Sequence, residues 1–195
     1  LNNNFNMDPW GGYSVATSDN LDAFTYNPAG FAIDHGQQTG YYWLANNNTL
    51  DDNSPFFYGF KVHGFGYSFQ FNKGDKLFNA TDVKISFAGK FNRNLSLGAQ
   101  WSKYNKNINM GVLIRPLNYL SLGLVSTFDE DLKELNSTRI GLALRPFRDD
   151  KITLGMDVLN QMQREIEDSE DVALTWIASY SPFLELCLGG AFSIR

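Results

Sequence analysis

The sequence predicts an all-β protein whose strands follow one another as an antiparallel meander. Three observations predict this fold class. Apolar and polar residues alternate with a period of two after residue 38. The connections between these segments are alternately short turns and long polar loops, and one hairpin pattern recurs along the chain. The chain of 195 residues fits a single domain, since domains commonly run to about 100–200 residues. We therefore expect one architecture to account for nearly all of it.

The first region, residues 1–38, lacks the alternation. Within it, Ser18–Phe24 is typical of a short helix that begins at a Ser or Asp cap. The Asn-Pro-Ala-Gly motif at residues 27–30 follows. It predicts a turn, because proline favours an extended residue before it and glycine permits a positive φ. We therefore predict an amino-terminal helix and plug segment over 1–38 and β-strands over 39–195.

The strands are predicted by the period-2 segments; Leu120, Leu122 and Leu124, for example, alternate with Ser121 and Gly123. With edges placed to within about 2–4 residues, the predicted strands lie at 39–46, 56–62, 64–72, 82–91, 94–104, 108–115, 118–128, 137–145, 151–160, 171–180 and 184–194. Most are about 8–11 residues long, compared with roughly 5–6 for a globular strand and roughly 9–11 for one that crosses a bilayer. Their length favours membrane-spanning strands.

The connections alternate in length. Tight turns, three of them with proline, lie at 91–94, 115–118, 145–150 and 181–183. Longer polar loops lie at 72–81, 129–136 and 161–170. The hairpin pattern of residues 90–98 recurs at 115–123, which indicates a meander of hairpins. Short turns on one rim and long loops on the other are typical of outer-membrane barrels.

The two faces of the predicted strands differ in size as well as polarity. One face carries Leu, Ile, Val, Met and aromatic residues, whereas the other is largely Gly, Ser, Ala and Thr, with Arg115, Arg139 and Arg145 near strand ends. A soluble barrel would carry many Lys and Glu on its outside. We therefore expect the bulky face to meet lipid and the small face to line a lumen. The prediction is a transmembrane barrel of about 11–14 strands in the outer membrane; a soluble β-sandwich or barrel is the alternative.

Composition excludes several other classes of protein. No apolar run approaches the roughly 18 residues that a transmembrane helix needs. The net charge of −5, with Lys and Arg scattered singly, argues against a nucleic-acid partner. One cysteine, Cys187, allows no internal disulfide and no cysteine-rich metal site. His35 and His63 stand beside glycines at turns without an oriented partner. We therefore predict no catalytic residue, no metal site and no cofactor.

The stretch Ser14–Ala32 resembles the start of the FadL- and PorV-type outer-membrane β-barrels. Those proteins begin with small residues, an Asp-Ala pair and an Asn-Pro-Ala-Gly-Leu pattern, and here Phe31 replaces the usual leucine. In that family the segment lies at the start of the barrel or within its lumen. The resemblance therefore implies structural or gating roles for the motif, and with the three arginines the predicted binding or gating residues are Asn27, Pro28, Ala29, Gly30, Arg115, Arg139 and Arg145.

The resemblance implies a non-enzymatic protein of the outer membrane of a Gram-negative bacterium. It would pass hydrophobic small molecules, or act as an anchor and shuttle in protein secretion, with outer-membrane lipid, hydrophobic small molecules or secretion-system proteins as partners. The same opening is similar to barrel-like regions fused ahead of a signal-peptide-peptidase protease domain, in which case the catalytic part lies beyond Arg195. A soluble ligand-binding β-barrel is the third hypothesis. Single-chain bacterial barrels have even strand counts, so an odd count leads us to expect a missed strand, a truncation or a missing domain.

Overall fold

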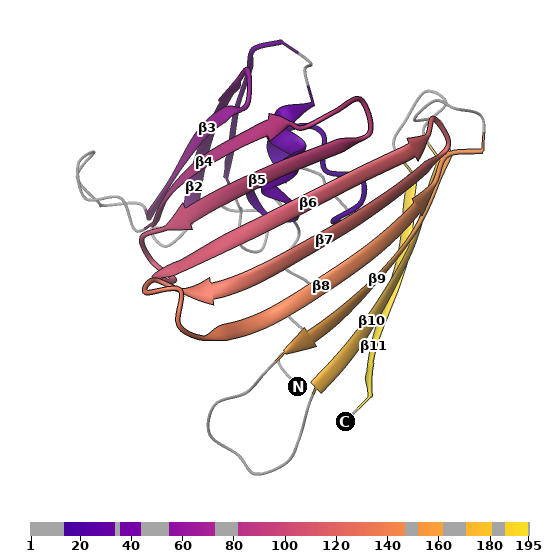
Figure 1. Ribbon diagram of the computed structural model, residues 1–195. Coiled ribbons are helices and arrows are strands. Elements are labelled where there is room, and N and C mark those ends of the chain that lie inside the picture. The colour runs from indigo at the N-terminus through magenta and orange to yellow at the C-terminus, as the bar shows by residue number, and fades with distance from the viewer. Residues whose placement is uncertain are drawn as a thin grey trace.

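The computed structural model describes residues 14–33, 36–43, 55–72, 82–146, 152–161, 171–180 and 186–194. Within these residues eleven strands form one sheet in the order β1 to β11, so that each strand pairs with its neighbours in sequence. The sheet curls around a short amino-terminal segment, which lies behind β4, β5 and β6 in Figure 1. The predicted all-β antiparallel meander is confirmed.

The strands lie where the alternation predicts them. They are β1 (Gln38–Trp43), β2 (Pro55–Val62), β3 (Phe65–Asn72), β4 (Asp82–Lys90), β5 (Leu95–Ser102), β6 (Asn107–Leu117), β7 (Leu120–Asp129), β8 (Leu135–Leu144), β9 (Ile152–Gln161), β10 (Asp171–Tyr180) and β11 (Leu186–Ile194). Predicted and observed edges agree to within two residues wherever both fall in the described residues. The predicted strand positions 44–46, 151 and 184–185 lie outside them.

The amino-terminal segment is built from two short 3₁₀ turns, η1 (Leu21–Phe24) and η2 (Pro28–Ala32). The helix predicted over residues 18–24 is therefore only a single 3₁₀ turn. The two expected caps bond elsewhere, because Ser18 Oγ donates to the Ser14 carbonyl and the Asp19 carboxylate pairs with Arg115. Without a side-chain cap the turn begins later and stays short. We call residues 14–33 the inner segment.

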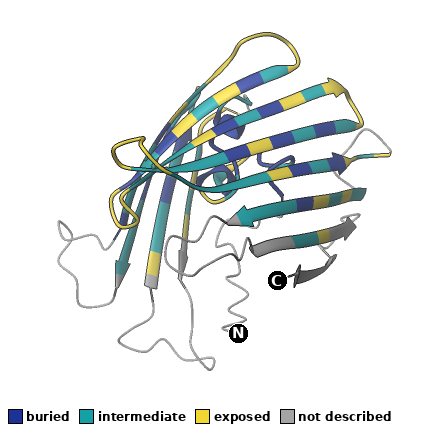
Figure 2. Cartoon of the chain, turned by 60° about the horizontal axis from the view of Figure 1, so that its bottom comes forward, coloured by how far each residue is buried: buried dark blue, intermediate teal, exposed yellow. Residues whose placement is uncertain are grey.

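The sheet has an inner face, which contacts the inner segment, and an outer face, which does not. Along β7, Gly123 and Val125 are buried while Leu124 between them is exposed. Figure 2 shows the same banding on several neighbouring strands. Exposed bulky residues of the outer face include Phe87, Leu97, Met110, Ile114, Leu124, Ile140, Leu144, Leu154, Met156 and Trp176. The prediction that bulky residues point away from the interior and small ones toward it is confirmed.

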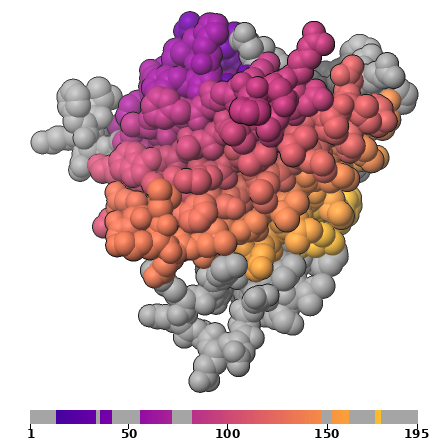
Figure 3. Space-filling view, viewed as in Figure 1, coloured from indigo at the N-terminus to yellow at the C-terminus, as the bar shows by residue number. Residues whose placement is uncertain are grey.

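The outer face is apolar and unbroken over the middle of the sheet. Viewed from the side of Figure 1, the side chains of β4 to β8 form one continuous surface in Figure 3. Over β2 to β4 this surface is aromatic. Phe60 stacks on Tyr67 with ring centroids 5.2 Å apart, and Phe65 lies 5.3 Å from Phe87. Such ring contacts join neighbouring strands across the face.

The sheet is open in the residues that the structure describes. The strand order begins at β1 and ends at β11, and these two strands are not hydrogen-bonded to each other. The closed cylinder predicted from the sequence is therefore not formed by the described strands. The described residues contain no helix long and apolar enough to span a membrane.

Candidate functional site

The candidate site is the contact between the inner segment and the inner face of the sheet. Turn η2 packs against β4, β5 and β6. A small apolar cluster forms within the inner segment itself, where the rings of Phe24 and Phe31 meet edge to face at 4.6 Å beside Ala23. Much of the remaining contact is polar. Among the described residues the buried polar and charged residues outnumber the buried hydrophobic ones, so this interior is held together mainly by hydrogen bonds and ion pairs.

Glycines on the inner face let the main chain of the inner segment approach the strands. A Cβ atom added to Gly98 would lie 2.4 Å from the carbonyl carbon of Pro28, and one added to Gly123 would lie 2.2 Å from the carbonyl oxygen of Val15. Real Cβ atoms do not come this close to backbone atoms. Glycine is therefore required at these two inner positions by contact with the inner segment.

The Asn27 side chain forms three hydrogen bonds, two within the inner segment and one to β6. Its Nδ2 donates to the carbonyls of Val15 at 2.8 Å and Val112 at 3.0 Å, and its Oδ1 accepts from the backbone N–H of Ala29 at 3.0 Å. The last bond caps η2. The four predicted motif residues Asn27, Pro28, Ala29 and Gly30 are all buried. A Cβ on Gly30 would lie 1.8 Å from the Ser18 carbonyl oxygen, so only glycine fits at this position of the motif.

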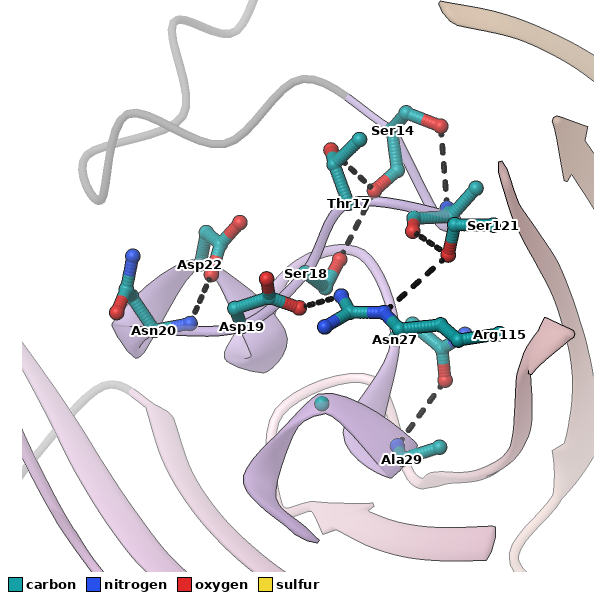
Figure 4. A network of polar contacts seen from close by, with 12 residues as sticks. Ser14, Thr17, Ser18, Asp19, Asn20, Asp22, Asn27, Ala29, Arg115 and Ser121 are labelled. Atoms are coloured by element: carbon teal, nitrogen blue, oxygen red, sulfur yellow. Dashed lines mark hydrogen bonds and ion pairs between the residues drawn. The ribbon is translucent and has the colours of Figure 1, made fainter. Parts of the chain in front are cut away.

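Asp19 forms ion pairs with two arginines at the end of the sheet where the short turns lie. Arg115, in β6, pairs with Oδ1, and Arg145, just after β8, approaches Oδ2 at 3.4 Å. The Asp19 side chain is 9% exposed, and the arginines are 24% and 17% exposed. In Figure 4, Arg115 points from the sheet toward Asp19. Arg115 Nε also donates to Ser121 Oγ, which donates to the Ala16 carbonyl at 2.5 Å.

Two lysines and a glutamine hold carbonyl groups of the inner segment. Lys61, in β2, is fully buried; its ammonium donates to the Asp19 and Gly30 carbonyls and lies 5.7 Å from the centroid of the Phe31 ring. Lys84 Nζ and Gln100 Nε2 both donate to the Phe24 carbonyl, at 3.4 and 3.1 Å. All three side chains therefore donate hydrogen bonds to the main chain of the inner segment.

On the inner face of β9, the Asp157 carboxylate also holds the inner segment. Asp157, in β9, accepts from Ser14 Oγ at 2.5 Å and from the backbone N–H of Val15 at 3.0 Å. Arg139 in β8 lies 5.8 Å from the centroid of the Tyr26 ring. Of the three predicted arginines, the structure brings Arg115 and Arg145 together on one carboxylate, while Arg139 stands apart beside an aromatic ring.

Sequence analysis did not propose Ser14, Asp19, Lys61 or Asp157 as site residues. Two of them carried a signal in the pattern. Lys61, near the end of β2, and Asp157, in the middle of β9, are inward-facing charges in strands of mainly apolar and small residues, where a charge is costly unless it is paired. Asp19 and Ser14 carried none, since they belong to a polar stretch without periodicity.

The hydrogen bonds and ion pairs of the site fasten the inner segment to the sheet. Within the described residues no three His, Cys, Asp or Glu side chains are grouped so as to hold a metal ion. His63 is exposed at the β2–β3 turn with a φ of 42°. His35 lies outside the described residues, and the side chain of Cys187 is not among those described.

The chain matches no family model, and comparisons with curated proteins and with solved structures give no match. The resemblance to FadL- and PorV-type barrels therefore stays a prediction from sequence.

Proposed function

We propose that this chain forms the wall and plug of an outer-membrane β-barrel of a Gram-negative bacterium, without catalytic activity, and that it passes hydrophobic small molecules when the inner segment moves. One observation carries the membrane part of the proposal. The sheet exposes its Leu, Ile, Met and aromatic side chains and buries its Ser, Asp, Lys and Gln side chains. A water-soluble sheet has the opposite arrangement, with polar residues outside.

Hydrocarbon is the solvent that fits such an outer face. Full burial of one Leu or Phe side chain is worth about 1.5–3 kcal/mol relative to leaving it in water, and many bulky residues are exposed here. The hydrogen-bonded meander satisfies the backbone groups between neighbouring strands, as a lipid environment requires. Strands of 8–11 residues from β2 to β11 also match the length of membrane-crossing strands.

The passage of small molecules depends on the inner segment. Glycine contacts leave no room between this segment and strands β5 to β7, so a molecule can pass there only if the segment shifts. Its tethers are hydrogen bonds and ion pairs, which water can replace more readily than it can replace an apolar contact. A secretion anchor and shuttle is the competing function, and it requires no movement of the inner segment. In the protease-fusion alternative, the parent reading frame would continue into a protease domain.

The membrane proposal is tested with spin labels in a Cys187→Ser background. A nitroxide at Leu124→Cys, on the outer face of β7, should be more accessible to oxygen than to a water-soluble nickel chelate in lipid vesicles. A label at Lys133→Cys, in the exposed β7–β8 loop, should show the reverse. If both labels are more accessible to the nickel chelate than to oxygen, the soluble alternative is supported. Recovery of the protein in the aqueous phase without detergent would support it as well.

The passage proposal is tested by locking the inner segment to the sheet. A Cβ on Gly155 would lie 3.7 Å from the Ser14 Cβ, which is a suitable separation for a disulfide. With Cys187→Ser, the pair Ser14→Cys and Gly155→Cys should abolish uptake of a hydrophobic dye by cells that display the parent protein, and a reductant should restore it. Each single cysteine variant is the matched control. Unchanged uptake with a fully formed disulfide would refute passage by movement of the segment and favour the anchor.

A further inference from the structure

We infer that lipid head groups bind a row of three polar side chains on the outer face, Ser126, Thr138 and Asn160, and that the hydrocarbon layer is therefore thinner against β7 and β8 than against β3 and β6. We call these three residues the polar row. The inference rests on the proposed function, because it takes the outer face as the surface that contacts lipid. It adds which part of the lipid this patch of the wall binds.

The polar row crosses three neighbouring strands. Ser126 of β7 pairs with Thr138 of β8, and Thr138 pairs with Asn160 of β9. Residues directly opposite each other on paired strands lie on the same face of a sheet. That face is the outer one, because Arg139, which follows Thr138, reaches a ring of the inner segment, and Ser126 alternates with the exposed Leu124. The polar row therefore interrupts an otherwise apolar face.

The polar row shortens the apolar stretch of the strands that carry it. Counted from the short turns, β3 and β6 have four successive apolar or aromatic residues on the outer face, whereas β7 and β8 have three before the polar row begins. These residues are Phe65, Tyr67, Phe69 and Phe71 in β3, Ile114, Val112, Met110 and Ile108 in β6, Leu120, Leu122 and Leu124 in β7, and Leu144, Leu142 and Ile140 in β8. One outward step is two residues, or about 6.6 Å along a strand. With a strand tilt of about 35–45°, the apolar stretch is shorter by about 5 Å across the bilayer.

The chemistry of the polar row excludes hydrocarbon as its solvent. Hydroxyl and amide groups are strongly destabilised in hydrocarbon unless they are hydrogen-bonded. Ser126, Thr138 and Asn160 are all half-buried, and within the described part of the chain Asn160 Oδ1 is buried without a hydrogen-bond partner. The amide gains a donor only by turning toward the surface. Lipid head groups, with their ammonium and hydroxyl groups and bound water, supply donors there.

A protein partner fits the polar row less well than head groups do. Phe128 is the next outward residue after Ser126 and lies beside the exposed loop of residues 130–134. Aromatic residues of outer-membrane barrels form girdles at the level of the head groups, so this level directly adjoins the polar row. A stable protein interface needs about 20–30 residues on each side. The polar row is far smaller, and the exposed Leu124 and Ile140 that border it suit hydrocarbon.

The first test compares the depth of two nearby positions in vesicles of phosphatidylethanolamine and phosphatidylglycerol. Ile108 of β6 pairs with Phe128, so it lies one outward step closer to the long loops than Ser126. In a Cys187→Ser background, a nitroxide at Ser126→Cys should nevertheless be more accessible to a water-soluble nickel chelate than one at Ile108→Cys, because the head groups descend to the polar row. A bilayer of uniform thickness gives the reverse order, which would overturn the inference. Low accessibility of labels at Ser126→Cys and Thr138→Cys to both oxygen and the chelate would mean that protein covers the row, and would overturn it as well.

The second test removes the hydroxyl groups and keeps the side chains similar in size. A nitroxide at Ile140→Cys reports the depth directly beside the polar row. In the combined Ser126→Ala and Thr138→Val variant this label should lie about 5 Å deeper, because the apolar stretch of β7 and β8 becomes one step longer. Ser137→Ala, which removes a hydroxyl from the inner face of the same strand, is the matched control and should leave the depth unchanged. An unchanged depth in the combined variant, or an equal shift in the control, would contradict the inference.

Failure of this inference and failure of the membrane proposal give different readings. If the label at Leu124→Cys is more accessible to the nickel chelate than to oxygen, the membrane proposal itself fails. If that label is more accessible to oxygen while the Ser126→Cys label lies deeper than the Ile108→Cys label, the outer face contacts lipid and only the polar-row inference fails.

Discussion

The two faces of the same strands obey different rules. On β7, Val125 is 8% exposed and Gly123 is buried, yet Leu124 between them is 37% exposed. On β8, Ala143 is 1% exposed beside Leu144 at 38%. Burial in this molecule therefore follows the side on which the inner segment lies and not the hydrophobicity of the residue. The comparison teaches that the contact with the inner segment and the outer apolar face can be altered independently.

The contact on the inner face is stabilised by specific polar interactions. The stability of the outer face depends on the solvent that surrounds it. Single polar substitutions inside should loosen the inner segment in any medium. Outward substitutions should matter only if the surrounding medium is apolar. The following changes test this contrast, beginning with the largest expected effect.

The largest effect is expected at Asp19. Asp19→Ala leaves Arg115 and Arg145 without their shared carboxylate in a largely buried place. Removing one partner of a buried ion pair costs about 3–5 kcal/mol, and the partial exposure of both arginines puts the expected loss near the lower end. The free energy of unfolding in urea, measured in detergent micelles, checks it.

The control for this change is an ion pair on the surface. Lys133 and Asp131 contact each other at 2.9 Å with side chains 73% and 67% exposed. Asp131→Ala should change the stability by about 0–1 kcal/mol. Equal losses for Asp19→Ala and Asp131→Ala would mean that the inner contact contributes no more than a surface pair.

The next effect belongs to the outer face. Leu124→Arg should destabilise the protein in a bilayer by about 2–4 kcal/mol if the residue lies near the bilayer midplane. Leu132→Arg is the control, since Leu132 is also an exposed leucine but lies in the β7–β8 loop. Folding in lipid vesicles, followed by urea titration, measures both. If Leu124→Arg is as harmless as Leu132→Arg, the outer face does not contact hydrocarbon.

Most of the strand architecture was predictable, because a strand with two different faces shows its period directly in the sequence. The alternation around Leu120, Leu122 and Leu124 predicts both the extent of β7 and the side that faces inward. Size was informative as well: Gly123 and Gly141 are inward residues that the inner segment and Asp157 approach closely. Closure was predicted too readily, because the number of strands in a sheet is set by pairing at its edges, which no local pattern reports.

The inner contact was less predictable. The Asn-Pro-Ala-Gly motif indicated a turn, and Asn27 indeed caps η2, but the partners of Asn27 lie 12 and 85 residues away in the chain. Arg115 and Arg145 stood out as charges near strand ends, whereas their partner Asp19 looked like a helix cap. Long-range partners such as these depend on how the segment folds back, which the strand period does not encode.

A smaller loss is expected when the inner glycine row is filled. Gly123→Ala places a Cβ 2.2 Å from the Val15 carbonyl, so the inner segment must shift, and overpacking of this kind costs about 1–3 kcal/mol. Gly89→Ala is the matched control, because nothing lies within 4 Å of the added methyl group. Protease cleavage within the inner segment should speed up for Gly123→Ala alone. Similar rates for the two variants would show that the segment does not press against β7.

The smallest effect is expected at Ser121, where the hydroxyl donates to the Ala16 carbonyl and accepts from Arg115 Nε at 3.4 Å. Ser121→Ala should cost about 1 kcal/mol, the ordinary contribution of a hydrogen bond. Because Arg115 joins Ser121 to Asp19, the Ser121→Ala and Asp19→Ala changes should not be additive, and a double-mutant cycle in the urea titration measures their coupling. Strict additivity would mean that Arg115 holds the two groups independently. A coupling of about 0.5 kcal/mol or more would show that the inner face holds the segment through one connected network.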